Sequence, residues 1–133
     1  MNTNELNKAV VVNFYHDVLN SRRIDQIRDV VSPDYRNAAG QGPEVVMQGA
    51  QQLIQAFPDI HWTLEEIVAD DDKVIVKQRT TGTHRGVFQG HAPSGNSFES
   101  EGFALYQLAE GKIIRHQVLT DRYNFLQQIG VIS

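Results

Sequence analysis

The sequence predicts a single α+β domain in which helices come first and a long antiparallel sheet follows. Before Pro58, apolar residues recur at helical spacing, and after it β-branched and aromatic residues form runs bounded by turn formers. Short connections between the later runs favour antiparallel neighbours. A chain of 133 residues has the length of one domain, so we expect residues 1–133 to form one unit with its helices packed on one sheet face.

Three helices are expected in the first half. The first covers residues 3–20, opens on a capping box, and carries the apolar positions Leu6, Val10, Phe14 and Val18. The second is short, can be capped by Ser21, and ends before Pro33 because the residue preceding a proline avoids helical angles. The third begins at Gly42-Pro43 and ends at Pro58.

Four strands are expected next, over residues 60–69, 73–84, 97–108 and 112–120. Residues 70–72 and 109–111 are short enough for hairpin turns, whereas residues 86–96 form a longer loop that could flank the mouth of a cavity. A short terminal helix over residues 122–128 is closed by Gly130. Apolar or small residues occur at both parities of the third strand, so one sheet face should cover the helices and the other should meet a second copy in a homodimer.

Composition removes several classes of function. The net charge of −4 and the absence of a basic cluster argue against a nucleic-acid partner. With no cysteine, the chain has no disulfide, zinc-thiolate site or thiol nucleophile, and its five histidines show no metal-ligand spacing, so we expect no metal site. The longest N-terminal apolar run is too short for a signal peptide or a membrane span, which favours a cytoplasmic protein without a membrane partner.

Several segments resemble a known family. They are GTHRGVFQGHAPSGNSF at 82–98, GKIIRHQVLTDRYNFLQQIG at 111–130, FPDIHWTLEEIVADDDKVIV at 57–76 and FYHDVLN at 14–20. Together they resemble the SnoaL-like polyketide cyclases, also called predicted ester cyclases, over nearly the whole chain. The resemblance implies a curved antiparallel sheet wrapped by helices into a cone, the nuclear transport factor 2-like architecture, around one apolar pocket.

The resemblance also implies a reaction. Characterised members close a ring by intramolecular aldol condensation without a metal or organic cofactor, using an aspartate as acid and base. That aspartate corresponds to Asp121, and the family's histidine five residues earlier corresponds to His116. The chain departs from the pattern at Gln117, where tryptophan is frequent, and at Asn37, where histidine is common.

Both catalytic candidates have a structural alternative. Burial in an apolar pocket would raise the pKa of Asp121 toward the range of a useful base, but the same carboxylate could merely cap the terminal helix. His116 could polarise a substrate oxygen, or it could be satisfied by a neighbouring strand. Positions 116 and 121 have opposite parity, so their side chains converge only if a bulge or the strand end resets the alternation.

Further residues are candidates for binding. An arginine, Arg79 or Arg115, beside Asp121 would suggest an epoxide hydrolase, although a second carboxylate is not evident. Buried phenols can donate to a substrate carbonyl or enolate, which singles out Tyr15 and Tyr35. The full set expected to line the pocket is Tyr15, Tyr35, Asn37, Phe57, Trp62, Gln78, Phe88, Phe103 and Tyr106.

The sequence thus favours a cofactor-independent cyclase or isomerase that acts on a small apolar carbonyl compound, such as a polyketide-like ester, in an internal pocket. The alternative is a binding or dimeric interaction module of the same fold, in which Asp121 is only a cap.

Overall fold

The computed structural model describes residues 2–132 and confirms the α+β class. Helix α1 (Thr3–Asn13) runs into the π-helix η1 (Phe14–Asn20), and the short turns η2 (Ile24–Gln26) and α2 (Ile27–Val30) follow. Helix α3 (Glu44–Ala56) precedes the four strands β1 (His61–Asp70), β2 (Lys73–Thr83), β3 (Ser97–Ala109) and β4 (Lys112–Thr120). Helix α4 (Arg122–Gln128) ends the fold.

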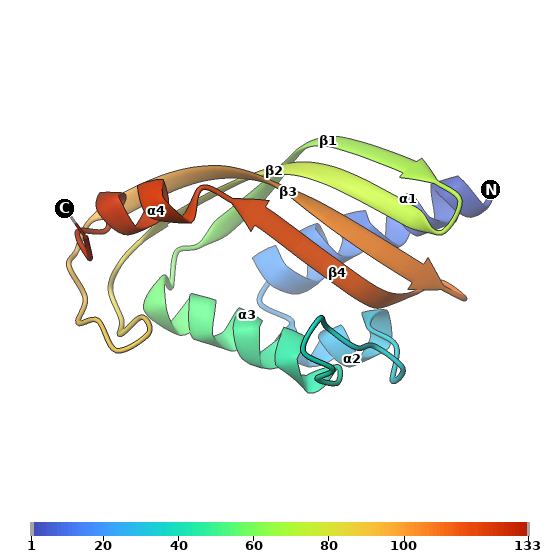
Figure 1. Cartoon of the computed structure of the whole chain (residues 1–133), viewed down its shortest axis with the longest axis horizontal. Coiled ribbons are helices and arrows are strands. Elements are labelled where there is room, and N and C mark those ends of the chain that lie inside the picture. Colours follow the sequence, from blue (N-terminus) through green and yellow to red (C-terminus); the bar gives the residue numbers. More distant parts are fainter. Residues whose placement is uncertain (1, 133) are drawn as a thin grey trace.

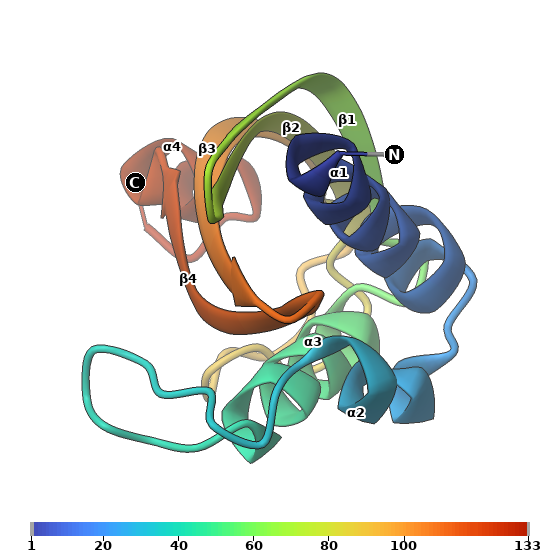
Figure 2. The ribbon, with the colours of Figure 1, turned by 90° about the vertical axis from the view of Figure 1, so that its right-hand side faces the viewer.

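The strands form one antiparallel sheet in the order β1-β2-β3-β4. The sheet is strongly curved, with α1, α2 and α3 on its concave side and α4 continuing from β4 at one end (Figures 1 and 2). Strands that follow each other in the sequence are also neighbours in the sheet, so no connection crosses over another strand. This order agrees with the hairpin turns predicted at 70–72 and 109–111. The predicted cone of sheet and helices is confirmed.

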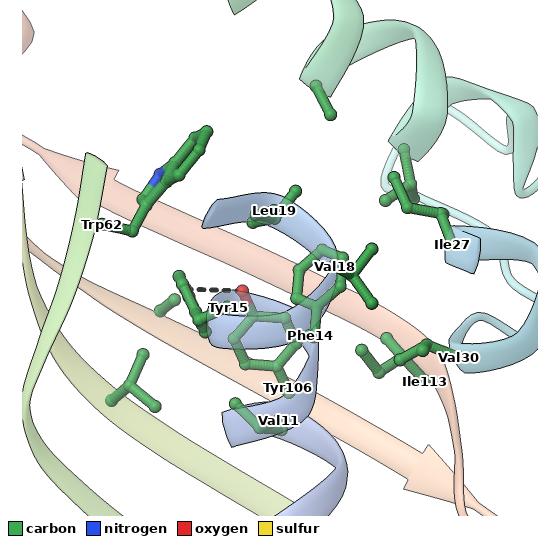
Figure 3. Close-up of a cluster of buried hydrophobic side chains, with 14 of the residues drawn as sticks. Val11, Phe14, Tyr15, Val18, Leu19, Ile27, Val30, Trp62, Tyr106 and Ile113 are labelled. Atoms are coloured by element: carbon green, nitrogen blue, oxygen red, sulfur yellow. Dashed lines mark hydrogen bonds between the residues drawn. The ribbon is translucent and has the colours of Figure 1, made fainter. Parts of the chain in front are cut away.

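The alternation of the strands decides which side chains face the helices. In β2 and β3 the even-numbered residues face the concave side and most of them are buried, whereas Ile75 and Phe103 lie on the outer face and are about half exposed. The core is formed by these inner positions and by helix residues such as Val11, Phe14 and Val18 (Figure 3).

Two details of the helices differ from expectation. The predicted first helix has the right limits, but its second half is a π-helix, and Leu6 is half exposed rather than part of the core stripe. Ser21 does not cap the second helix: its hydroxyl donates to the carbonyl oxygen of His16 at 3.0 Å. A side chain that satisfies the preceding turn is not free to cap the next one.

Candidate functional site

A bulge in β4 turns His116 toward the concave side. Leu108 pairs with Ile113 and Gln107 pairs with Arg115, so β4 holds one extra residue at this point. Without the bulge, Ile113 and His116 would face opposite ways, because side chains alternate along a strand. With it, both join the inner face, and His116 lies opposite Tyr106 of β3.

A chain of polar groups crosses this inner face. The Tyr15 hydroxyl from η1 lies 2.5 Å from Oε1 of Gln78 on β2 and 2.6 Å from the hydroxyl of Tyr106. An amide oxygen only accepts, so Tyr15 donates to Gln78 and its oxygen must accept from Tyr106. All three side chains are at least 95% buried. Figure 3 shows Tyr15 and Tyr106 within the cluster of buried side chains.

His116 is held from two sides. Its Nδ1 lies 2.9 Å from the hydroxyl of Tyr35, and its ring stacks on the ring of Tyr106 at 5.5 Å with an interplanar angle of 9°. Burial lowers the pKa of His116, which favours a neutral imidazole at pH 7. Within residues 2–132 no group forms a hydrogen bond with Nε2 of His116, so that nitrogen is available to a substrate.

The phenols of this site stay protonated and do not act as bases. Burial raises the pKa of Tyr15, and burial together with the neighbouring Tyr15 raises the pKa of Tyr106. Burial also raises the pKa of Tyr35, although nearby Arg115 opposes that shift. Each hydroxyl therefore keeps its proton at neutral pH.

Asp121 lies outside this network. It is exposed, follows the last residue of β4, and caps α4, its carboxylate accepting a hydrogen bond from the backbone N–H of Asn124 at 2.9 Å. Register is continuous from Arg115 to Thr120, so no bulge brings the two candidates to one face. The expected burial of Asp121 is not met, because the first turn of α4 holds the carboxylate at the end of the strand.

The other predicted site residues divide into two groups. Trp62 is buried on the inner face and projects from β1 into the interior (Figure 3). Phe103 does not line the cone, because its odd position in β3 places it on the outer face, 54% exposed. Asn37 also lies elsewhere: its Oδ1 accepts from the backbone N–H groups of Ala39 and Gln41, so the side chain shapes its own loop.

Phe57 and Phe88 belong to an aromatic cluster at the other end of the concave side. They pack with Phe98 and Phe125 at ring distances of 4.8 to 5.7 Å. His84 lies against Phe57 and is fully buried, and its Nδ1 accepts from the backbone N–H of Ser94 at 3.2 Å. Sequence reasoning did not assign His84 to the site, although the even positions of β2 indicate that it faces inward.

The arginine arrangement of an epoxide hydrolase is not formed. Arg79 lies on the outer face and pairs with Glu99 at 3.2 Å, not with Asp121. Within the described chain, no group of three or more His, Cys, Asp or Glu residues is arranged to hold a metal. None of the described helices is long and apolar enough to cross a membrane.

Two surface grooves lie away from the polar network. One, of about 460 Å³, runs between α1 and the hairpin turns beside Leu6, Asn7 and Glu110. The other, of about 380 Å³, lies between α2 and α3 beside Arg28 and Met47. Neither is lined by His116, Gln78 or Asp121.

Solved structures share the fold over nearly the full length of the chain. A candidate SnoaL-like polyketide cyclase from Jannaschia sp. CCS1 is 24% identical, with 100% of this chain and 97% of that one covered and a TM-score of 0.88. TsrD from Streptomyces laurentii is 18% identical, with 99% and 100% covered and a TM-score of 0.88. IdmH, a candidate polyketide cyclase from Streptomyces antibioticus, is 24% identical, with 93% and 98% covered and a TM-score of 0.79.

No curated protein matches the sequence. The family model for SnoaL-like polyketide cyclases matches residues 9–129, which is most of the chain. With that match and a nuclear transport factor 2-like fold shared with these structures, the chain belongs to the SnoaL-like polyketide cyclase family.

Proposed function

We propose that the chain is a cofactor-independent enzyme of the cyclase or isomerase type that moves a proton at carbon in a small apolar carbonyl compound. The observation that carries the proposal is His116, a neutral imidazole on the concave face whose Nδ1 lies beside the Tyr35 hydroxyl and whose Nε2 has no partner within residues 2–132. The proposal takes the tautomer in which Nδ1–H donates to the Tyr35 oxygen, so that Nε2 carries the free electron pair. A general base must reach the proton it removes, and a pKa near or below neutrality keeps the base unprotonated.

The proposed reaction begins with proton transfer to Nε2 of His116. The electron pair of the broken C–H bond forms an enolate, whose oxygen is stabilised by hydrogen-bond donors of the inner face. In a cyclisation the enolate carbon then bonds to a second carbonyl carbon of the same molecule, and the resulting alkoxide receives a proton. The family resemblance implies an acid and base role for Asp121, at the end of the strand that carries His116. Because the register keeps Asp121 off the face that carries His116, the proposal assigns the first proton transfer to His116 and keeps Asp121 as the alternative base.

A second candidate function is supported by one observation. Asp121 is exposed and satisfies the first turn of α4, as a purely structural cap would. The same concave face would then bind an apolar ligand without transforming it.

Deuterium exchange separates the two functions. α-Tetralone, a bicyclic aryl ketone, is incubated with the protein in D₂O, and replacement of the protons beside its carbonyl is followed by NMR. We expect exchange above the buffer rate, and a loss of about 100-fold or more in His116→Gln, the usual contribution of a general base. A loss confined to Asp121→Asn would instead make Asp121 the base. Exchange no faster than in buffer would contradict the enzymatic proposal and leave the binding function.

The proposal includes a cytoplasmic homodimer. The chain has no cysteine, in keeping with a reducing compartment, and its outer sheet face carries the exposed apolar residues Val68, Ile75, Phe103 and Leu119.

A further inference from the structure

We infer that Gln78 recognises the carbonyl oxygen of the ligand, through an amide that Tyr15 and Tyr106 hold in one orientation. The inference rests on the proposed function and assigns the specificity of the same concave face. Gln78 would be a binding residue, and the two tyrosines would position it.

The hydrogen-bond chain fixes which end of the amide is free. Oε1 of Gln78 accepts the proton of Tyr15 at 2.5 Å, and Tyr15 in turn accepts from Tyr106 at 2.6 Å. Rotating the amide by half a turn would reverse the chain of donors and leave the buried Tyr106 hydroxyl without an acceptor among residues 2–132. The nitrogen, with its two N–H donors, therefore faces away from the tyrosines.

That nitrogen has no protein partner. No residue between 2 and 132 accepts a hydrogen bond from Nε2 of Gln78, although the side chain is 95% buried. Within residues 2–132, two side-chain nitrogens have neither exposed surface nor a hydrogen-bond partner: Nε of Arg79 and Nε2 of His84. Nε2 of Gln78 is not among them, so the amide nitrogen keeps some exposure to solvent although the residue as a whole is buried.

Trp62 has the same property. Trp62 is 94% buried on the neighbouring strand, and its indole N–H donates to no described residue. The indole nitrogen is not one of the fully covered atoms, so it too keeps some exposure to solvent. Leu64 pairs with Gln78 and Trp62 pairs with Thr80, so the two donors lie on adjacent strands of the inner face. A buried donor without a partner costs free energy that an acceptor on a ligand would recover.

The surroundings select an uncharged acceptor. The inner positions of β2 and β3 nearest Gln78 are Val76, Thr80, Gly102 and Ala104, none of which carries a charge. The partial positive charge of the N–H donors would repel a cation. A carboxylate would lose its hydration without gaining a counter-ion, which costs free energy. A ketone, ester or lactone oxygen on an apolar skeleton satisfies the amide at the least cost.

Trp62 provides the measurement, because it is the only tryptophan of the chain. Its emission is titrated with α-tetralone and with tetralin, which has the same ring system without the oxygen. The quantity of interest is the ratio of the two dissociation constants. Between the wild type and Gln78→Met, we expect the preference for α-tetralone to fall about tenfold, the loss of one well-placed hydrogen bond.

Tyr15→Phe tests the positioning role. It keeps the ring and the core packing but frees the amide, so we expect the preference for α-tetralone to fall while tetralin binds as before. A purely structural role of Tyr15 would weaken both ligands alike. Gln52→Met, at an exposed position of α3, is the matched control and should keep the wild-type ratio.

The outcomes distinguish the inference from the proposed function. An unchanged ratio in both Gln78→Met and Tyr15→Phe would overturn the role of Gln78 and leave the proposed function standing. A wild type that binds neither compound would contradict both. If Gln78→Met does not fold, as judged by thermal unfolding, the ratio in Tyr15→Phe decides.

Discussion

A single extra residue in β4 determines what His116 can do. The bulge beside Gln107 and Leu108 resets the alternation, so that the imidazole turns inward and stacks on Tyr106. From the sequence, His116 could be named as a candidate but its face could not be assigned, because an antiparallel pair leaves no clear signal of where its bulge will fall. Asp121 was proposed as a catalytic residue by resemblance, and its position before a helix predicted the cap that the structure shows.

The buried imidazole makes stability depend on pH. Burial lowers the pKa of His116 in the folded protein, so below its unfolded value of about 6.5 the unfolded chain binds more protons than the folded one. The stability that neutral His116 allows is therefore fully present above the unfolded pKa of about 6.5, and it is lost as the pH falls from that value toward the lower pKa of the folded protein. Urea unfolding near pH 7.5 and near pH 5.5 should show this loss.

His116→Gln should lose less stability than the wild type over the same pH interval, because glutamine does not titrate. His61→Gln, at an exposed position of β1, is the control and should keep the wild-type dependence. An identical loss in His116→Gln and the wild type would contradict the buried neutral imidazole.

Two substitutions of Asp121 separate the cap from the chemistry. Asparagine is as good an N-cap as aspartate, so Asp121→Asn should unfold at the same denaturant concentration as the wild type. Asp121→Ala removes the acceptor of the Asn124 N–H group and should lower the free energy of unfolding by about 1 kcal/mol. Equal stability of Asp121→Ala and the wild type would show that the cap contributes nothing.

At the scale of elements, periodicity predicted most of the fold and missed its local departures. The limits of β4 agree with the structure, and those of the other strands differ by one residue, because β-branched runs end at strong turn formers. The π-helix η1 was not predicted, since its buried residues Phe14, Tyr15, Val18 and Leu19 also fit an α-helical stripe. Phe103 was misplaced because both faces of β3 carry apolar residues.

The loop after β2 docks on the end of α3 through a glycine. The carbonyl oxygen of Ala56 accepts from the N–H groups of Arg85 and Gly86, each at 3.0 Å. A Cβ at Gly86 would lie 2.1 Å from the carbonyl oxygen of Gln55, so Gly86→Ala forces backbone apart. We expect a loss of at least about 1–3 kcal/mol in urea unfolding, as for other overpacked sites.

Gly49, in α3 itself, is the opposite case. No atom lies within 4 Å of a Cβ built there, so Gly49→Ala should stabilise the chain by about 0.5–1 kcal/mol through helix propensity. Destabilisation of similar size by both substitutions would contradict the close approach at Gly86.

The whole molecule has two unlike sheet faces. The concave face is covered by helices (Figure 2) and carries the neutral polar network, whereas the outer face leaves the apolar side chains of Val68, Ile75, Phe103 and Leu119 exposed. Leu119 on β4 is 75% exposed and pairs with Phe103 on β3, and Val68 on β1 pairs with Ile75 on β2, so the four residues spread across all four strands of the sheet. Neighbouring exposed apolar side chains on an open sheet face favour a surface that meets another protein.

A second copy of the chain is the partner that the sequence analysis predicts for this face. Sedimentation velocity at micromolar concentration should show a dimer for the wild type, and Phe103→Lys, which sets a charge into the middle of the patch, should shift it toward monomer without unfolding the chain. Val87→Lys is the matched control, because Val87 is as exposed as Val68 but lies in the loop after β2. A wild type that sediments as a monomer would contradict the dimer, and dissociation by Val87→Lys with retention by Phe103→Lys would place the interface elsewhere.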